Sequence, residues 1–140
     1  MRSIRFAFDV DLEFLHWHDR HISLEELRHA VTQRRVLIAE ENGERAGWLR
    51  YNLFWDNTPF INLLYVLEGH RSKGVGKELT VFWEAEMARQ GFVVFMTSTQ
   101  SDEYAQHFYR KLGYRDVGGF QLPGESYELI FVKEKTGDSL

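Results

Sequence analysis

The hydrophobic pattern changes period within one short stretch, Val66-Leu67-Glu68-Gly69-His70-Arg71-Ser72-Lys73-Gly74-Val75-Gly76-Lys77-Glu78-Leu79. Before it, a nearly continuous apolar run that begins at Ile61 indicates a buried strand. After it, apolar residues recur at helical spacing, at Val75, Leu79, Phe82, Trp83 and Met87. The stretch therefore predicts a strand and a helix joined by a basic turn with two glycines.

The residue types of this turn favour anion binding. The first backbone N–H groups of a helix have no intrahelical partner and carry the positive end of its dipole. Gly74 and Gly76 let a phosphate approach the backbone closely, and Arg71, Lys73 and Lys77 add positive charge around it. We expect a pyrophosphate here, while a plain surface turn before a glycine-initiated helix stays open on these residues alone.

Two other phosphate-binding motifs do not fit the turn. A Walker A loop requires glycine where this chain has Arg71, and serine or threonine where it has Glu78. The dinucleotide-binding fingerprint requires a third small residue, and Leu79 occupies that place. The turn therefore belongs to neither class.

Composition bounds the class of protein. The 140 residues are 44% hydrophobic and 15% aromatic, which is enough for one domain, residues 1–140, with a packed core. The absence of cysteine excludes disulfides, thiolate metal sites and a cysteine nucleophile. It is also compatible with a reducing cytoplasm, where we expect the protein to be.

Charge and hydropathy exclude two kinds of partner. The formal net charge of −4 argues against nucleic acid, because phosphate contacts favour a basic surface. The amino terminus lacks the apolar segment of a signal peptide, and no apolar run reaches membrane-spanning length. We therefore expect no nucleic acid and no membrane as partner, and mild acidity suits a cationic acceptor.

The first half of the chain predicts one strand, two helices and three further strands. Asp9 is expected to cap the first helix, and Ser23-Leu24-Glu25-Glu26 is a capping box for the second. Asn42-Gly43 supplies a hairpin turn. The expected strands are 3–8, 36–40, 46–55 and 60–67.

The second half predicts three more strands and one helix after the basic turn and its helix. Phe92–Met96 is a continuous apolar run, as in a central strand buried on both faces. Ser101 is expected to cap the next helix and Gly113 to stop it. Strands are expected at 114–122 and 126–133, with a frayed tail from Gly137.

Three nearby histidines, His16, His18 and His21, raise the question of a metal site. Their spacing lacks the i, i+4 pair with an intervening glutamate, and there are no thiolates to complete a ligand set. We therefore expect no metal, and favour solvated loop histidines or residues that line an acceptor pocket.

A second motif lies at Asp102–Tyr114, and the two motifs together resemble the GCN5-related N-acetyltransferase (GNAT) superfamily. Arg71-Ser72-Lys73-Gly74-Val75-Gly76 is similar to the family's Arg/Gln-x-x-Gly-x-Gly/Ala signature, which binds the pyrophosphate of acetyl-CoA. The second motif matches at Ala105, Phe108, Tyr109, Lys111, Gly113 and Tyr114. Asp102 stands where the family often has asparagine, which removes an amide donor. The chain looks like a small stand-alone bacterial-type member.

The resemblance implies an α+β fold, an α/β/α sandwich. Its mixed, mostly antiparallel central sheet would have six to seven strands, with a splay between the fourth and fifth strands and about four helices. It also implies a single acetyltransferase domain and allows a homodimer.

The resemblance further implies an acetyl-CoA-dependent N-acetyltransferase that transfers the acetyl group directly to a primary amine of a small molecule or peptide, with coenzyme A as product. The thioester carbonyl would meet the backbone N–H of Tyr65 or Val66. Tyr109 corresponds to the general acid, and Glu68 is a candidate general base. The implied coenzyme-binding residues are Leu64, Tyr65, Val66, Arg71, Ser72, Lys73, Gly74, Val75, Gly76, Lys77, Asp102 and Tyr109.

Each of these assignments has an alternative. Tyr109 is otherwise a core tyrosine, and Glu68 a solvated charge. Many family members have an acidic residue on the preceding strand, near where this chain has Asn62, which cannot take a proton but could orient a water that does. The whole chain is otherwise a catalytically weak acyl-CoA-binding or regulatory module, or an interaction protein with a coincidental turn. The acceptor amine stays open, although aromatic residues on the expected strands are candidates for its cleft, namely Trp48, Tyr51, Phe54 and Trp55.

Overall fold

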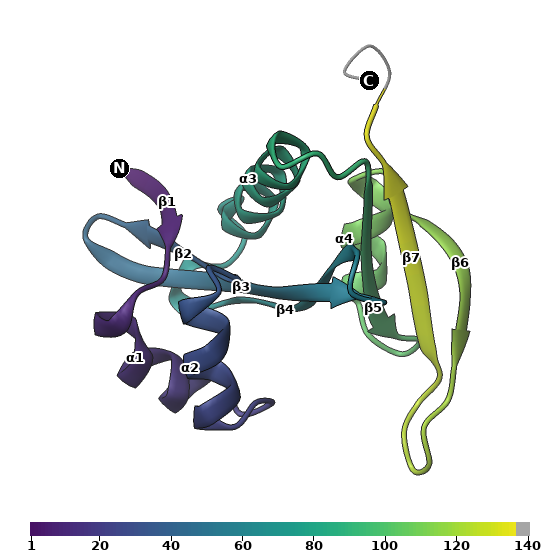
Figure 1. The fold of residues 1–140 in the computed structure, drawn as a ribbon, viewed down its shortest axis with the longest axis horizontal. Coiled ribbons are helices and arrows are strands. Elements are labelled where there is room, and N and C mark those ends of the chain that lie inside the picture. The colour runs from purple at the N-terminus through teal and green to yellow at the C-terminus, as the bar shows by residue number, and fades with distance from the viewer. Residues whose placement is uncertain (137–140) are drawn as a thin grey trace. The chain divides into compact units, whose positions relative to one another are not determined.

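The computed structural model describes residues 1–136, so the predicted tail from Gly137 lies outside the described residues (Figure 1). Within them, the strands are β1 (Arg2–Phe6), β2 (Val36–Glu41), β3 (Glu44–Phe54), β4 (Thr58–Val66), β5 (Val94–Gln100), β6 (Arg115–Phe120) and β7 (Glu128–Glu134). The α-helices are α1 (Leu12–His18), α2 (Leu24–Thr32), α3 (Val75–Arg89) and α4 (Ala105–Lys111). Two short 3₁₀ turns are η1 (Asp9–Asp11) and η2 (Glu68–His70).

The strands form a mixed sheet in the order β1-β2-β3-β4-β5-β7-β6. β4 and β5 are parallel, with Phe60 opposite Met96 and Ile61 opposite Thr97. The β1–β2, β2–β3, β5–β7 and β6–β7 pairs are antiparallel. The predicted α+β class with a mixed, mostly antiparallel sheet is therefore confirmed, whereas the splay between the fourth and fifth strands stays a prediction.

Residue contacts divide the chain into two compact units. The first unit comprises Met1–Asn52 and Leu63–Trp83. In it, α1 and α2 lie on one face of the strands and the first half of α3 lies on the other (Figure 1). Successive side chains along a strand point to opposite sides of the sheet, so the strands contribute core residues to both faces. Leu15 and Leu27 pack with Trp48 on the first face, and Tyr51 contacts Trp83 on the second, with ring centroids 5.8 Å apart.

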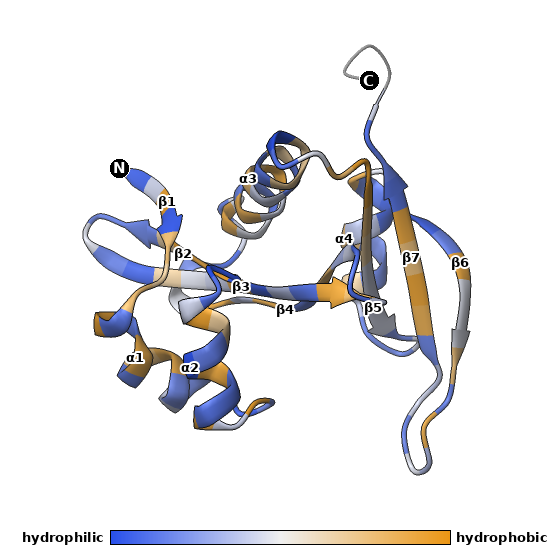
Figure 2. Cartoon of the chain, viewed as in Figure 1, coloured by the Kyte–Doolittle hydropathy of each residue, from blue (hydrophilic) through white to orange (hydrophobic). Residues whose placement is uncertain are grey.

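The second unit comprises Leu53–Asn62 and the chain from Glu84 on. Its centre is β7, whose middle is apolar (Figure 2). Tyr109 of α4 contacts Tyr114 and Phe131, with ring centroids 5.5 and 6.4 Å away. The carboxylate of Glu84 accepts hydrogen bonds from the Tyr114 hydroxyl at 2.7 Å and the Lys133 ammonium at 2.9 Å. These contacts hold α4 against the strands from its buried side.

One of the three predicted helix caps is confirmed and two are wrong. The Ser23 hydroxyl accepts from the Glu26 N–H at 3.2 Å, as the capping box requires. Asp9 instead opens the turn η1, and the buried Asp11 carboxylate accepts from the Phe8 N–H at 2.9 Å. Ser101 does not cap α4, because α4 begins at Ala105 and its N-cap residue is Tyr104. The Ser101 N–H donates to the Tyr127 carbonyl at 2.7 Å.

The fifth strand differs from its prediction in position and burial. Phe92 belongs to the turn that caps α3, because its N–H donates to the Met87 carbonyl while Gly91 takes a φ of +102°. β5 therefore begins at Val94 and runs on to Gln100. Its residues alternate between buried and half-buried, so the expectation of a strand buried on both faces is wrong.

Candidate active site

The basic turn lies on the surface between β4 and α3, and residues 71–74 are exposed. Ser72 and Gly74 have φ values of +64° and +86°, in the left-handed region. The first helical hydrogen bond runs from the Glu78 N–H to the Gly74 carbonyl, at 3.0 Å. The N–H groups of residues 75–77 therefore precede the first helical donor and have no acceptor within the helix. Successive N–H groups in such a turn form an anion-binding concavity.

Arg71 folds back onto the end of β4. Its Nε donates to the Val66 carbonyl at 2.8 Å, and its guanidinium carbon lies 5.2 Å from the centroid of the Tyr65 ring. These contacts bring the positive charge of Arg71 to Tyr65 and Val66, two of the residues expected to bind the coenzyme. Leu64, which is also expected to bind it, is half-buried in the same strand.

A charge network beside the turn escaped the sequence analysis. Glu41 accepts from Arg2 Nη2 at 2.6 Å, and its other oxygen lies 2.8 Å from Nδ1 of His70. Arg2 Nη1 also pairs with Glu78 of α3 at 3.0 Å. The hydrogen bond with His70, followed by that from Arg2, lowers the pKa of Glu41 to about 2. The network ties the edge of the sheet to η2 and α3, and only the β1–β2 register, which places Arg2 opposite Glu41, could have revealed it.

Gly47 is a second position that sequence reasoning missed. A Cβ at Gly47 would lie 2.6 Å from the Tyr65 carbonyl oxygen, so no other residue fits without moving the backbone. β3 therefore approaches β4 closely at the strand segment expected to meet the thioester. The available signal was a single glycine inside a strand pattern, which often marks a close backbone approach.

Tyr109 is built into the core of the second unit. Its side chain is 5% exposed, and its hydroxyl makes a hydrogen bond with the Thr97 side chain on β5. Burial raises the pKa of Tyr109 to about 12, and the hydrogen bond with Thr97 partly opposes that rise. The phenol therefore keeps its proton throughout the neutral pH range.

The two carboxylates of the predicted site lie on the surface. Glu68 begins η2 and is exposed, in the same unit as the turn. Asp102 is also exposed and accepts from the Ser126 hydroxyl at 2.9 Å, in the same unit as Tyr109. Asn62, at which an acidic residue was missing, is exposed on β4. Water can therefore reach each of these side chains.

The aromatic residues considered for an acceptor cleft divide into core and surface. Trp48 and Tyr51 are buried, and Phe54 is half-buried. Trp55 is 80% exposed and takes a φ of +55° in the turn between β3 and β4. Trp48 and Tyr51 therefore contribute to packing on the two faces of β3, and Trp55 is the surface aromatic of the set.

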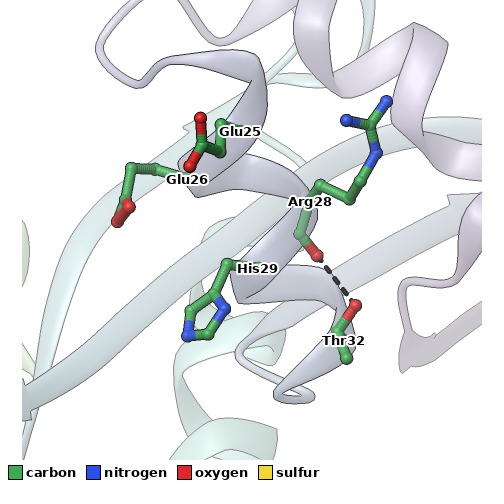
Figure 3. Close-up of a pocket in the computed structure, with 5 residues that line it drawn as sticks. All are labelled: Glu25, Glu26, Arg28, His29 and Thr32. Carbon is green, nitrogen blue, oxygen red and sulfur yellow. Dashed lines mark hydrogen bonds between the residues drawn. The ribbon is translucent and has the colours of Figure 1, made fainter.

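A polar hollow on α2 contains none of the predicted site residues. It has a volume of about 360 Å³ and is lined by Glu25, Glu26, Arg28, His29 and Thr32, all from that one helix (Figure 3). The Thr32 hydroxyl donates to the Arg28 carbonyl at 3.0 Å. Its charged side chains follow the outer surface of the helix, which is an ordinary solvated face.

The described residues contain neither a cluster of metal ligands nor a membrane-spanning helix. Within residues 1–136, no group of three or more His, Cys, Asp and Glu side chains is arranged to hold a metal ion. In the same part of the chain, no helix is long and apolar enough to cross a membrane. His16, His18 and His21 are exposed.

Comparison with known proteins identifies the class of fold and family. The model of the acetyltransferase (GNAT) family matches residues 4–114, which include both sequence motifs. None of the curated proteins searched matches the chain by sequence.

Several solved structures have a similar fold. Ard1 from Thermoplasma volcanium superposes with a TM-score of 0.84 at 16% identity, over 97% of this chain and 99% of that one. A GNAT-family acetyltransferase from Bacillus cereus gives 0.80 at 21% identity, over 98% and 99%. PaiA N-acetyltransferase from Thermoplasma acidophilum, solved in complex with coenzyme A, gives 0.78 at 19% identity, over 96% and 99%.

Proposed function

The chain belongs to the acetyltransferase (GNAT) family, and we propose that it transfers the acetyl group of acetyl-CoA directly to a primary amine of a small molecule or peptide. The observation that carries this proposal is the turn at residues 71–77, of which residues 71–74 are exposed. It combines left-handed backbone at Ser72 and Gly74 with helix N–H groups that have no acceptor within the helix. A diphosphate supplies the acceptors that this backbone lacks.

The coenzyme's diphosphate would occupy the turn from Arg71 to Lys77, including Ser72, Lys73, Gly74, Val75 and Gly76. Its pantetheine arm would pair with the backbone of Leu64, Tyr65 and Val66, and Asp102 would accept a further hydrogen bond from that arm. Because the Val66 carbonyl already accepts from Arg71, the guanidinium must move or share that acceptor when the coenzyme binds. The thioester carbonyl would then face the N–H of Tyr65 or Val66, which stabilises the oxyanion.

The chemical step is attack by a neutral amine nitrogen on the thioester carbonyl carbon. The C–S bond breaks, the sulfur leaves as the thiolate of coenzyme A, and the nitrogen loses a proton to form the amide. We assign Tyr109 to the departing sulfur. Proton transfer from a phenol of pKa about 12 to a thiolate whose conjugate acid has a pKa of about 8.5 is uphill by about 5 kcal/mol, so Tyr109 acts first as a hydrogen-bond donor to the developing charge. Because the Thr97 hydroxyl donates to the Ile61 carbonyl, the Tyr109 hydroxyl donates to Thr97 and must exchange that bond for one to the sulfur.

The amine's proton needs an acceptor. Glu68 is the candidate because it is exposed at the end of β4, in the unit that carries the turn. We propose that it takes the proton through a water molecule, which its exposure allows. Asn62 cannot accept a proton as a base, but its amide can orient that water.

The test has a binding arm and a turnover arm. Acetyl-CoA should raise the melting temperature of the protein, because a ligand that binds only the folded state stabilises it. An amine panel should then show formation of free coenzyme A that depends on the amine. Binding without turnover would favour the alternative, a catalytically weak acyl-CoA-binding or regulatory module. The absence of any thermal shift at millimolar acetyl-CoA would contradict the coenzyme assignment itself.

Three further assignments complete the proposal. The chain is a single acetyltransferase domain over residues 1–140. The enzyme works in the cytoplasm, which agrees with its lack of cysteine. A homodimer is compatible with this activity, and light scattering of the purified protein measures it directly.

A further inference from the structure

One carboxylate, that of Glu41 at the end of β2, is shared between the two elements that flank the basic turn. Its Oε1 lies 2.8 Å from Nδ1 of His70, the last residue of η2, and its Oε2 accepts from Arg2 Nη2 at 2.6 Å. Nη1 of the same arginine lies 3.0 Å from the carboxylate of Glu78, in the first turn of α3. The Glu41 carboxylate therefore connects the residue before Arg71 with the helix that follows the turn.

The residues of this network belong to the first compact unit, and its centre is largely shielded from water. The side chains of Glu41, Arg2 and His70 are 13%, 18% and 19% exposed. Partly buried ion pairs are screened less than surface pairs. Arg2 also borders the turn itself, because its Nη1 is 3.8 Å from the position that a Cβ of Gly74 would take. The network therefore lies beside the backbone that we assign to the diphosphate.

Charged groups from several elements face His70. Glu41 of β2 lies at its Nδ1, and Glu44 of β3 lies 3.9 Å from its Nε2. Arg2 and Lys73 act electrostatically on Glu41 in turn. Histidine is the side chain that ordinarily changes charge between pH 5 and 8, whereas the other members are carboxylates, a lysine and an arginine. A proton on His70 is therefore the one change of charge that this network is built to feel near neutral pH.

That proton changes how firmly the start of the turn is held. The Glu41 carboxylate stays ionised, because its hydrogen bonds with His70 and then with Arg2 lower its pKa to about 2. Protonated His70 gives it a charge-assisted hydrogen bond, about twice as strong as the bond from a neutral imidazole. Only while both bonds to Glu41 hold are η2 and α3 fixed relative to one another. A site that is already ordered costs a ligand less entropy on binding.

We propose that His70 and Arg2 are positioning residues for coenzyme binding. Through their shared partner Glu41 they fix both ends of the turn at residues 71–77, and protonation of His70 strengthens this hold. The inference rests on the proposed binding of the coenzyme's diphosphate at the turn. A proton on His70 would also attract the diphosphate directly, and the experiment below separates the two effects.

The test measures the dissociation constant of acetyl-CoA by calorimetry at pH 8 and pH 5.5, in the wild type and in His70→Gln. The ratio of the two constants cancels the titration of the coenzyme's own phosphates and of the other histidines, which both proteins share. We expect the ratio, variant over wild type, to be about one at pH 8, because the glutamine amide can donate as a neutral imidazole does. It should rise to about five at pH 5.5. A constant ratio, or one that falls, would overturn the inference.

Two backgrounds test the path through Glu41. In Glu41→Gln and in Arg2→Ala the His70→Gln ratio at pH 5.5 should return to about one, because each change breaks the connection between His70 and α3. A ratio that stays near five in either background would show direct attraction of the diphosphate and overturn the positioning role. Melting temperatures at both pH values establish that each variant is folded.

The matched control is His29→Gln, which removes a histidine from the polar hollow on α2. Its ratio should be about one at both pH values, and a rise to five would overturn the assignment to His70. Acetyl-CoA binding with no difference between the proteins would refute this inference and leave the proposed function standing. The absence of any binding at millimolar acetyl-CoA would refute both.

Discussion

The basic turn and Tyr109 belong to the two sequence motifs that we assign to one reaction, but the turn is exposed and Tyr109 is buried. The turn is exposed, its backbone takes left-handed φ values at Ser72 and Gly74, and the first N–H groups of α3 have no acceptor within the helix. Tyr109 is buried, packed against aromatic rings and hydrogen-bonded to Thr97. The N–H groups of the turn lack acceptors within the helix, which a ligand would supply, whereas the Tyr109 hydroxyl already forms a hydrogen bond with Thr97.

The difference separates binding from chemistry. A surface that must capture a charged coenzyme gains from unpaired donors, because a partner within the protein would have to be displaced. A group that acts on a leaving atom gains from a fixed position, which packing provides. The turn should therefore control coenzyme affinity, and Tyr109 should control turnover.

The largest expected effect is on turnover. Tyr109→Phe should lower kcat by about 10³-fold, within the usual range for loss of an acid or hydrogen-bond donor at the leaving group, because the ring stays and only the hydroxyl is lost. Coenzyme affinity, measured by calorimetry, should change by less than about twofold, since the turn supplies the charge contacts. An unchanged kcat would show that Tyr109 is a packing residue.

A second buried tyrosine provides the control for this variant. Tyr114 donates to Glu84 at 2.7 Å and is 3% exposed. Tyr114→Phe removes an equally buried hydroxyl and should lower the free energy of unfolding by about 1–3 kcal/mol, because it costs Glu84 a hydrogen bond. A comparable loss of kcat in both variants would mean that destabilisation, not chemistry, explains the first result.

The next effect is on coenzyme affinity. Gly74→Glu should weaken acetyl-CoA binding by about 10²-fold, because it adds negative charge and a side chain at the diphosphate site. Gly43→Glu is its control: Gly43 has a φ of +84°, nearly that of Gly74, and open space around its Cβ position. Equal losses of affinity in the two variants would show that backbone strain causes the loss, and that the turn is not the diphosphate site.

Local sequence was sufficient for the features that depend on neighbouring residues. Two glycines among basic residues predicted the turn. The helical spacing of apolar residues predicted α3, which begins at Val75. Ser23 was correctly predicted as a cap, and Asn42 and Gly43 take the positive φ values that a tight hairpin turn requires. In each case the partner lies within a few residues along the chain.

Features set by distant partners could not be predicted in this way. The Ser101 N–H donates to the Tyr127 carbonyl, which continues the pairing of β5 with β7 beyond Gln100, and α4 begins only at Ala105, too far along the chain for Ser101 to cap it. Arg2 and Glu41 lie 39 positions apart and meet only through strand pairing. For Tyr109, the motif gave the residue and its candidate role, but not the burial that raises its pKa. That burial depends on Phe131 of the closing strand.

Alkaline pH tests whether the phenol is buried. The pKa of Tyr109 is raised from about 10 in the unfolded chain to about 12 in the folded one, first by burial, so its stabilising contribution is complete below pH 10. It should be lost as the pH rises from about 10 to 12, because the unfolded phenol ionises first. Relative to Tyr109→Phe, the wild type should lose on the order of 2 kcal/mol of unfolding free energy over this range. Urea denaturation measures it, and parallel pH curves would mean that the phenol is solvated.

The smallest expected effect concerns Arg71, which is both exposed and engaged with Val66. Arg71→Ala should weaken acetyl-CoA binding by about fivefold to tenfold, because the backbone N–H groups remain and one exposed charge is lost.

Arg89→Ala removes the same charge from the other end of α3, where the exposed guanidinium pairs with Glu86, and should leave affinity nearly unchanged. Because screening weakens exposed charges, the Arg71 effect should shrink between 0.05 and 0.5 M salt. A loss as large as that of Gly74→Glu, and independent of salt, would show that Arg71 holds Val66 and the turn in place. Arg71 would then be a positioning residue, and the backbone N–H groups would bind the diphosphate.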